Sequence, residues 1–251
     1  MILVLAGTRE GREVVELLRR HGRRVLASVV SAYGGELVDA ERLQVGPLDQ
    51  AGMEELLRRE AVRGVVDATH PYAREASRNA RAACRAAGVP YLRLERPPAD
   101  LPGTGEVYPV ADYPAAAELA SSFGSTVFLT TGSRHLAVFL EAARPRGVRV
   151  VARVLPEAEV LAECRRLGLT PADLIAMQGP FTIELNLALF RHYQAAVVVS
   201  KESGAAGGFP EKAAAAAELG VPLVVIRRGQ ADPAAVASPR EALEWVLRTV
   251  S

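Results

Sequence analysis

The sequence predicts an α/β protein made of two parallel-sheet domains. Short apolar segments that suit buried strands alternate with segments of helical apolar period along nearly the whole chain. Such alternation is typical of parallel sheets with helices on both faces. Between Arg96 and Gly105, Pro and Gly are too dense to continue a helix or a central strand. Because 251 residues suffice for two small domains, we expect one domain over 1–98 and another over 99–251.

The first element of the chain combines a buried strand with a glycine turn. Ile2 to Ala6 form an unbroken apolar run, which suits a strand buried on both faces. The segment Gly7-Thr8-Arg9-Glu10-Gly11 interrupts this run, and a helical apolar period begins at Val14. A strand, a tight turn and a helix start with free backbone N–H groups together form an anion site.

This turn is less specific than the full dinucleotide-binding motif. It has two glycines where Gly-x-Gly-x-x-Gly has three, so the side chains of Thr8 and Arg9 would have to supply contacts. Taken alone, the turn suits an ordinary βα connection equally well.

The end of the second predicted strand, over 24–30, bears on the choice of coenzyme. A dinucleotide site that prefers NAD places Asp or Glu near this point, to bond the ribose 2′-hydroxyl. The chain has Ser28 and Ser31 here and no carboxylate between them. Two hydroxyls can bond a 2′-phosphate without repelling it, which favours NADP; the alternative is that a serine simply ends the strand.

The first half continues with further strands and helices, and polar residues follow one of these strands. We expect strands over 43–46, 65–69 and 91–94, and helices over 53–60 and 74–87. Thr69, His70 and Tyr72 stand at the carboxyl end of the strand over 65–69, where open α/β sheets bind ligands. This makes His70 a site candidate, although a lone histidine in a loop is also typical of a solvated side chain.

The second half repeats the alternation and carries polar loops. Strand candidates lie over 107–110, 126–130, 148–154, 174–177, 196–199 and 223–226. Right-handed crossovers place all strand-to-helix loops on one edge of a sheet. Four of these loops contain Gly, a hydroxyl or a cation, over 130–135, 153–156, 178–182 and 200–204. Because Arg134, His135, Arg153 and Lys201 supply charge there, the loops predict a site for an anionic ligand.

The two lysines of the chain lie close together in sequence. Of 30 basic residues only Lys201 and Lys212 are lysine. A lysine kept where arginine is used everywhere else indicates a need for a compact ammonium group, and the alternative is chance. The glycine-rich segment over 203–212 could close over a ligand or form an ordinary turn.

Composition excludes several classes of protein. A net charge of +1 without a dense basic and aromatic tract does not indicate a nucleic-acid surface. The first apolar stretch is too short for a signal peptide and no later one suits a membrane span, so we expect a cytoplasmic protein without membrane contact. Cys84 and Cys164 lack metal-ligand spacing and are expected to be small buried residues, so we predict no metal.

Six segments together resemble the precorrin-6A reductase family of cobalamin biosynthesis. They are Gly7-Thr8-Arg9-Glu10-Gly11, Asp67-Ala68-Thr69-His70-Pro71-Tyr72-Ala73, Pro90-Tyr91-Leu92-Arg93-Leu94-Glu95-Arg96, Thr131-Gly132-Ser133-Arg134, Met177-Gln178-Gly179-Pro180-Phe181 and Ser200-Lys201-Glu202-Ser203-Gly204. The second and the last of these are far more specific than the glycine turn.

The resemblance implies a fold and a reaction. The fold would be two Rossmann-like parallel-sheet domains with a cleft between them and an exchange of their last strands. The reaction would be hydride transfer from NADPH to a ring carbon of precorrin-6A, giving precorrin-6B. Two alternatives remain open: cobalt-precorrin-6A reduction, with NADH in place of NADPH, and a non-catalytic nucleotide- or anion-binding protein. A further implied partner is the next enzyme of the corrin pathway, which would receive the product.

The resemblance also implies site residues. Coenzyme binding is expected at Gly7, Thr8, Arg9, Gly11, Ser28, Ser31 and Thr69. Binding of the substrate carboxylates is expected at His70, Arg134, Lys201, Ser203 and Lys212, and His70 is also the candidate proton donor.

Overall fold

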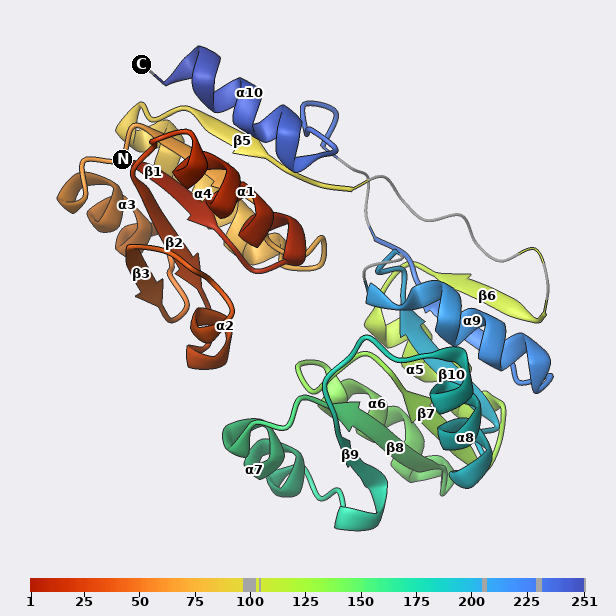
Figure 1. The fold of residues 1–251 in the computed structure, drawn as a ribbon. Coiled ribbons are helices and arrows are strands. Elements are labelled where there is room, and N and C mark those ends of the chain that lie inside the picture. Colours follow the sequence, from red (N-terminus) through yellow and green to blue (C-terminus); the bar gives the residue numbers. More distant parts are fainter. Residues whose placement is uncertain (97–102, 104, 205–206, 229–231, 251) are drawn as a thin grey trace. The chain divides into compact units, whose positions relative to one another are not determined.

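A computed structural model describes residues 1–96, 103, 105–204, 207–228 and 232–250. The chain divides into two compact units (Figure 1). The first unit comprises Met1–Pro97 and Gln230–Ser251, and the second comprises Pro98–Gly229. Each unit is built around its own parallel sheet, which confirms the prediction of two parallel-sheet α/β domains.

The first unit contains a five-stranded sheet in the order β3-β2-β1-β4-β5. The strands are β1 (Ile2–Leu5), β2 (Val25–Val29), β3 (Arg42–Val45), β4 (Gly64–Asp67) and β5 (Tyr91–Arg93). The helices are α1 (Arg9–Arg20), α2 (Ala32–Glu36), α3 (Gln50–Arg59), α4 (Arg74–Ala87) and α10 (Pro239–Thr249). All neighbouring strands are parallel, so their carboxyl ends share one edge of the sheet.

Helices cover both faces of this sheet, as the unbroken apolar run of β1 predicts. Ile2 and Val4 pack in a core cluster with residues of α1 and α10. Leu3 and Leu5, whose side chains point to the other face, pack in a second cluster with residues of α3 and α4. Every residue of β1 is buried, since both faces are covered.

The last segment of the chain lies in the first unit, whereas the expected division at 98 places it in the second. Helix α10 packs against α1, and Leu243 and Val246 join the core cluster on that face. Val236 pairs in parallel with Leu94, just beyond the end of β5. The apolar face of a helix predicts burial but not the partner against which it is buried. The cleft and the exchange of last strands stay predictions.

The second unit contains a six-stranded parallel sheet in the order β6-β11-β10-β7-β8-β9. The strands are β6 (Val107–Val110), β7 (Thr126–Leu129), β8 (Arg149–Val154), β9 (Leu174–Ala176), β10 (Val197–Lys201) and β11 (Leu223–Ile226). The helices are α5 (Tyr113–Ser122), α6 (Leu136–Ala143), α7 (Ala158–Arg166), α8 (Ile183–His192) and α9 (Phe209–Glu218), with short 3₁₀ helices at Arg144–Arg146 and Pro171–Asp173.

Phe128 and Phe190 meet edge to face within the core of this unit, with ring centroids 5.0 Å apart. Helices α8 and α9 pack side by side, and both follow carboxyl ends of strands. Their first turns therefore lie at the ligand-binding edge of the sheet.

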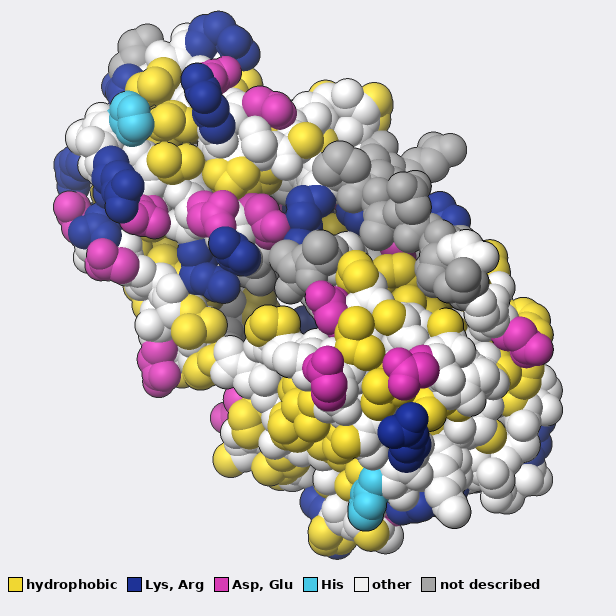
Figure 2. Space-filling view, turned by 45° about the vertical axis from the view of Figure 1, so that its right-hand side comes forward, with side chains coloured by type: hydrophobic (Ala, Val, Ile, Leu, Met, Phe, Trp, Pro, Cys, Tyr) yellow, Lys and Arg dark blue, Asp and Glu magenta, His cyan; other side chains and the backbone are white. Residues whose placement is uncertain are grey.

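The surface carries charges of both signs. In Figure 2, Lys and Arg side chains lie interspersed with Asp and Glu on the face shown. Among the described helices, none has the length and apolar character that crossing a membrane requires. Within the same residues, no group of three or more His, Cys, Asp and Glu side chains is placed to hold a metal ion.

Candidate functional site

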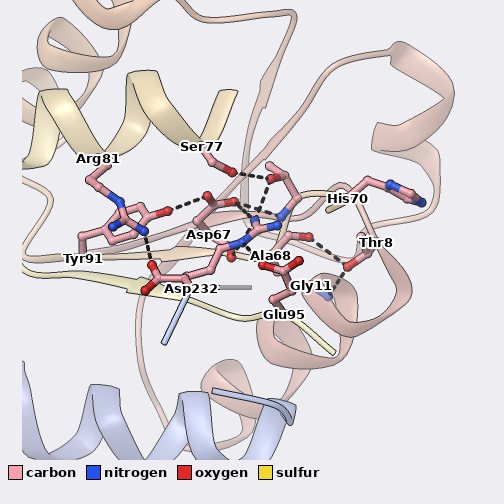
Figure 3. Close-up of polar contacts among 12 residues, drawn as sticks. Thr8, Gly11, Asp67, Ala68, His70, Ser77, Arg81, Tyr91, Glu95 and Asp232 are labelled. Carbon is pink, nitrogen blue, oxygen red and sulfur yellow. Dashed lines mark hydrogen bonds and ion pairs between the residues drawn. The ribbon is translucent and has the colours of Figure 1, made fainter. Parts of the chain in front are cut away.

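The turn between β1 and α1 is fixed by the side chain of Thr8. Its hydroxyl accepts a hydrogen bond from the N–H of Gly11 at 3.2 Å and donates one to the carbonyl of Ala68 at 2.9 Å (Figure 3). Thr8 thereby caps α1 and ties its start to the end of β4. The expected contact of the Thr8 hydroxyl with a coenzyme stays a prediction, because these two bonds already engage that group.

The two glycines of the turn serve different purposes. A Cβ at Gly11 would lie 2.8 Å from Cα of Ala6 and 3.1 Å from Cβ of Ala68, so only glycine lets α1 pack this closely on the sheet. A Cβ at Gly7 would be 3.7 Å from Cα of Thr69, an ordinary contact. The fold therefore has no steric need for glycine at position 7, which is exposed. The space above it suits the close approach of a ligand phosphate to the helix start.

The remaining predicted coenzyme residues lie on the same half of the unit. Ser28 is buried in β2, and the hydroxyl of Ser31 caps α2 by accepting from the N–H of Gly34 at 3.1 Å. The sequence does not predict α2, since a five-residue helix containing two glycines shows no apolar period. The side chain of Arg9 is exposed and pairs with Glu13 at 2.9 Å.

A buried ion pair supports the end of β4. Asp67 is fully buried and Arg93 of β5 is 5% exposed, and their side chains meet at 2.8 Å. The other carboxylate oxygen of Asp67 accepts from the hydroxyl of Tyr91 at 2.7 Å. Two charges removed from water are stable together only when their hydrogen-bonding groups are satisfied, as they are here.

This pair positions Thr69, one of the predicted coenzyme residues. Arg93 donates to the Thr69 hydroxyl at 2.8 Å, and the backbone N–H of Thr69 donates to Asp67 at 3.0 Å. A third contact of 3.1 Å joins the hydroxyls of Thr69 and Ser77 (Figure 3). Thr69 is therefore held by three contacts next to the start of α1, two at its hydroxyl and one at its backbone N–H.

A small hollow opens beside this network. It is lined by Thr8, Glu10, Thr69, Pro71, Leu94, Glu95 and Arg96. Within it, Glu10 pairs with Arg96 at 3.1 Å. Because a carboxylate in the first turn of α1 would repel a phosphate, the Arg96 guanidinium offsets that charge where an anion would bind.

His70 lies apart from the buried network. Its ring points away from Asp67 in Figure 3 and lies 5.4 Å from the ring of Tyr72. The backbone N–H of Tyr72 donates to Nδ1 of His70 at 3.4 Å. Its role as proton donor or carboxylate ligand stays a prediction.

The two lysines lie in the second unit at the carboxyl edge of its sheet. Lys201 ends β10, and Lys212 belongs to the first turn of α9. Burial and the charge of Arg134 lower the pKa of Lys201 to about 8. Burial and the charges of Arg153 and Lys201 lower the pKa of Lys212 to about 7, against an opposing effect of Glu211.

Further cations are close to these lysines. Burial and the charges of Arg134 and Lys201 lower the pKa of His135, the residue just before α6. Arg134 is exposed, whereas Ser203 is 6% exposed and donates its hydroxyl to the carbonyl of Gly207 at 3.3 Å. The edge is thus a region of desolvated positive charge, which an anionic ligand would neutralise.

Arg153, one of the cations predicted at this edge, lies in β8, is 5% exposed and bonds the fully buried Asn186 of α8. Asn186 and Glu202 are not among the individual site residues predicted from the sequence. Glu202, also fully buried, pairs with Arg227 at 3.0 Å and with Arg228 at 3.3 Å. The signal in the sequence is a polar residue within an apolar segment, since Asn186 stands between Leu185 and Leu187. In the first unit, Arg93 stands between Leu92 and Leu94 in the same way.

A comparison with protein families decides the identity of the fold. The model of the precorrin-6x reductase family, CbiJ/CobK, matches residues 1–247. The chain belongs to this family.

Curated relatives of this precorrin-6x reductase family member include both kinds of enzyme. Cobalt-precorrin-6A reductase of Priestia megaterium is 38% identical over 250 residues, covering 98% of each chain. Precorrin-6A reductase of Mycobacterium tuberculosis is 35% identical over 254 residues, covering 98% of this chain and 96% of its own.

A solved structure, CobK precorrin-6A reductase, matches with a TM-score of 0.83 and 30% identity, covering 99% of this chain and 97% of that one. The resemblance drawn from six sequence segments is therefore confirmed at the level of family and fold.

Proposed function

We propose that the protein reduces precorrin-6A to precorrin-6B, with cobalt-precorrin-6A as the alternative substrate and NADPH as the hydride source. The observation that carries this is the group of cations at the carboxyl edge of the second unit's sheet. It includes Lys201 at the end of β10 and Lys212 in the first turn of α9, and burial lowers the pKa of both. A precorrin bears many carboxylates around a flat apolar ring, so its site needs several separated positive charges. Family membership over residues 1–247 supports the same reaction.

The first unit offers residues that fit a nicotinamide coenzyme. The exposed Gly7 leaves room beside the start of α1, a helix of 12 residues, and Gly11 allows that helix to pack closely on β1. The backbone N–H groups of the first turn would bind the pyrophosphate. Thr69, held by Arg93, would position the part of the coenzyme next to β4. When bound, the coenzyme supplies a hydride.

The second unit would hold the tetrapyrrole by its carboxylates. Lys201, Lys212 and Arg134 would each bind an acid group, and Ser203 would add a hydroxyl. Fixing several carboxylates orients a flat ring, and orientation of reacting groups is a large part of the rate gain in such enzymes. His70 is kept as the candidate proton donor. Hand-over of the product to the next corrin-pathway enzyme and a cytoplasmic location stay predictions.

The assay of this proposal is coenzyme oxidation, followed as loss of absorbance of the reduced nicotinamide. We expect oxidation in the presence of precorrin-6A or its cobalt form, and comparison of the two gives the preferred ring. An unchanged absorbance with either substrate would contradict catalysis and indicate a non-catalytic binding protein instead.

The preference for NADPH can be tested at one hydroxyl. We expect the wild-type protein to bind NADPH more tightly than NADH, because no carboxylate stands between Ser28 and Ser31. Ser31→Asp keeps the cap of α2, since Asp caps helices as well as Ser does, and adds a charge that repels a 2′-phosphate. This variant should shift the preference toward NADH. Tighter binding of NADH by the wild-type protein would contradict the proposed roles of Ser28 and Ser31.

The affinity for the tetrapyrrole should fall as the pH rises. The pKa of Lys212 is about 7 and that of Lys201 is about 8. Both side chains therefore lose their charge as the pH rises from about 7 to about 9. Burial lowers the pKa of Arg153 to about 10, so this side chain stays mostly charged over the same range. Each lysine charge that binding requires should cost about tenfold in affinity per pH unit above its pKa. Dissociation constants measured across this range test the prediction, and a flat profile would contradict it.

A further inference from the structure

Arg153, counted above only as one of several cations at this edge, is held by neighbours to which neither the family comparison nor the proposed function gives a role. Arg153 stands near the carboxyl end of β8, and its guanidinium carbon lies 3.9 Å from the ring centroid of Phe181. Its Nη1 donates to Oδ1 of Asn186 at 2.9 Å. Asn186 is itself held, because its amide donates to the carbonyl of Thr182 at 2.8 Å. A stacked and hydrogen-bonded guanidinium is fixed in orientation before any ligand arrives.

Among the described residues, no carboxylate forms a salt bridge with Arg153. Its one hydrogen bond there goes to a neutral amide, and burial lowers the pKa of Arg153 to about 10. A buried arginine that stays charged and bonds a single neutral acceptor retains donors for an anion.

Lys212 brings a second buried cation to the same place. Asn186 and Lys212 occupy corresponding positions in the first turns of α8 and α9, which pack side by side. Lys212 is 7% exposed, and its Nζ donates to the carbonyl of Gly207 at 2.7 Å. The helix dipole makes a cation at the amino end of a helix unfavourable. The nearby charge of Arg153 repels the Lys212 ammonium as well. Glu211 offsets part of this cost.

We propose that Arg153 and Lys212 bind one carboxylate of the tetrapyrrole between them, and that Asn186 and Phe181 position the Arg153 guanidinium for it. The inference rests on the proposed function and adds a subsite to it. A carboxylate there would receive charge-assisted hydrogen bonds from both side chains. The amino ends of α8 and α9 would favour its negative charge as well. It would relieve the repulsion between the two cations. The instability of the ligand-free pair is therefore a source of affinity for the acid.

A matched pair of variants on β8 tests the role of Arg153. Arg153→Gln and Arg149→Gln each remove one positive charge from the same strand, at opposite ends. Arg149 is exposed and pairs with Asp173 at 2.7 Å. We expect Arg153→Gln to raise KM for the tetrapyrrole about 10- to 100-fold, leaving KM for the coenzyme unchanged, and Arg149→Gln to change neither. Equal and small effects in both folded variants would overturn the proposal.

Lys212→Met provides a variant whose folding is not at risk, because replacing a buried charge by an apolar side chain is commonly neutral or stabilising. We expect its KM for the tetrapyrrole to rise while its denaturation midpoint stays at or above that of the wild-type protein. If both cations bind the same carboxylate, the effects of Arg153→Gln and Lys212→Met should not add in the double variant. Additive effects would mean two separate anions and overturn the shared subsite.

Asn186→Asp separates positioning from mere structure. The new carboxylate keeps an acceptor for Arg153 but neutralises its charge internally. We expect KM for the tetrapyrrole to rise as in Arg153→Gln, with kcat little changed. If Asn186 only supports the fold, this variant should keep the wild-type KM. Normal turnover by the wild-type protein with unaffected variants refutes the subsite alone, whereas absence of turnover by the wild-type protein refutes the proposed function as well.

Discussion

Asp67→Asn is expected to lower the free energy of unfolding by about 3 kcal/mol, because it removes the carboxylate that the buried Arg93 guanidinium contacts at 2.8 Å and leaves it only the longer contact with Glu95, at 3.5 Å. Both partners are almost completely buried, so water cannot replace the lost carboxylate. Tyr91 also loses a charged acceptor. Urea denaturation followed by circular dichroism measures the change.

The control for this variant is a salt bridge on the surface. Glu13→Gln removes one partner of the Arg9–Glu13 pair, whose side chains are 72% and 43% exposed. Its expected effect is below about 1 kcal/mol, since water screens an exposed pair. An Asp67→Asn protein as stable as Glu13→Gln would show that the buried pair does not hold the end of β4 in place.

Gly7→Val is expected to weaken coenzyme binding by about 100-fold or more while leaving the free energy of unfolding within about 1 kcal/mol of the wild-type value. A Cβ at this position makes only an ordinary contact with Thr69, so the chain can accommodate it. The added side chain would instead occupy the space in which a phosphate approaches the start of α1. Titration with NADPH, followed by coenzyme fluorescence, measures the loss.

Gly11→Val is the matched comparison for this prediction. Its Cβ would lie 2.8 Å from the Ala6 backbone, so α1 must move and the protein should lose about 1 to 3 kcal/mol of stability. A folded Gly7→Val protein with wild-type affinity for NADPH would contradict the assignment of this turn to the coenzyme.

The order of strands and helices could be predicted from the sequence because each element has its own spacing of apolar residues. Strand β1, helix α4 and the separation into two sheets follow from such patterns. The placement of α10 could not be predicted, because its partner α1 is more than two hundred residues away in the chain.

The candidate site divides in the same way. The glycine turn and the two lysines can be recognised in short segments of the sequence. The structure places Lys201 and Lys212 at the same edge of one sheet. The pairs Asp67–Arg93 and Arg153–Asn186 join residues 26 and 33 positions apart. No local pattern states that two polar residues in different apolar segments will be buried against each other.

The central claim is that the first unit binds the nicotinamide coenzyme and the second binds the tetrapyrrole. Its most direct test is to measure the affinities of Gly7→Val and Lys201→Ala for each ligand separately. We predict a crossed result, in which Gly7→Val weakens the binding of NADPH far more than that of the tetrapyrrole, and Lys201→Ala does the reverse. If both variants weaken the binding of the same ligand and spare the other, the assignment of ligands to units is wrong.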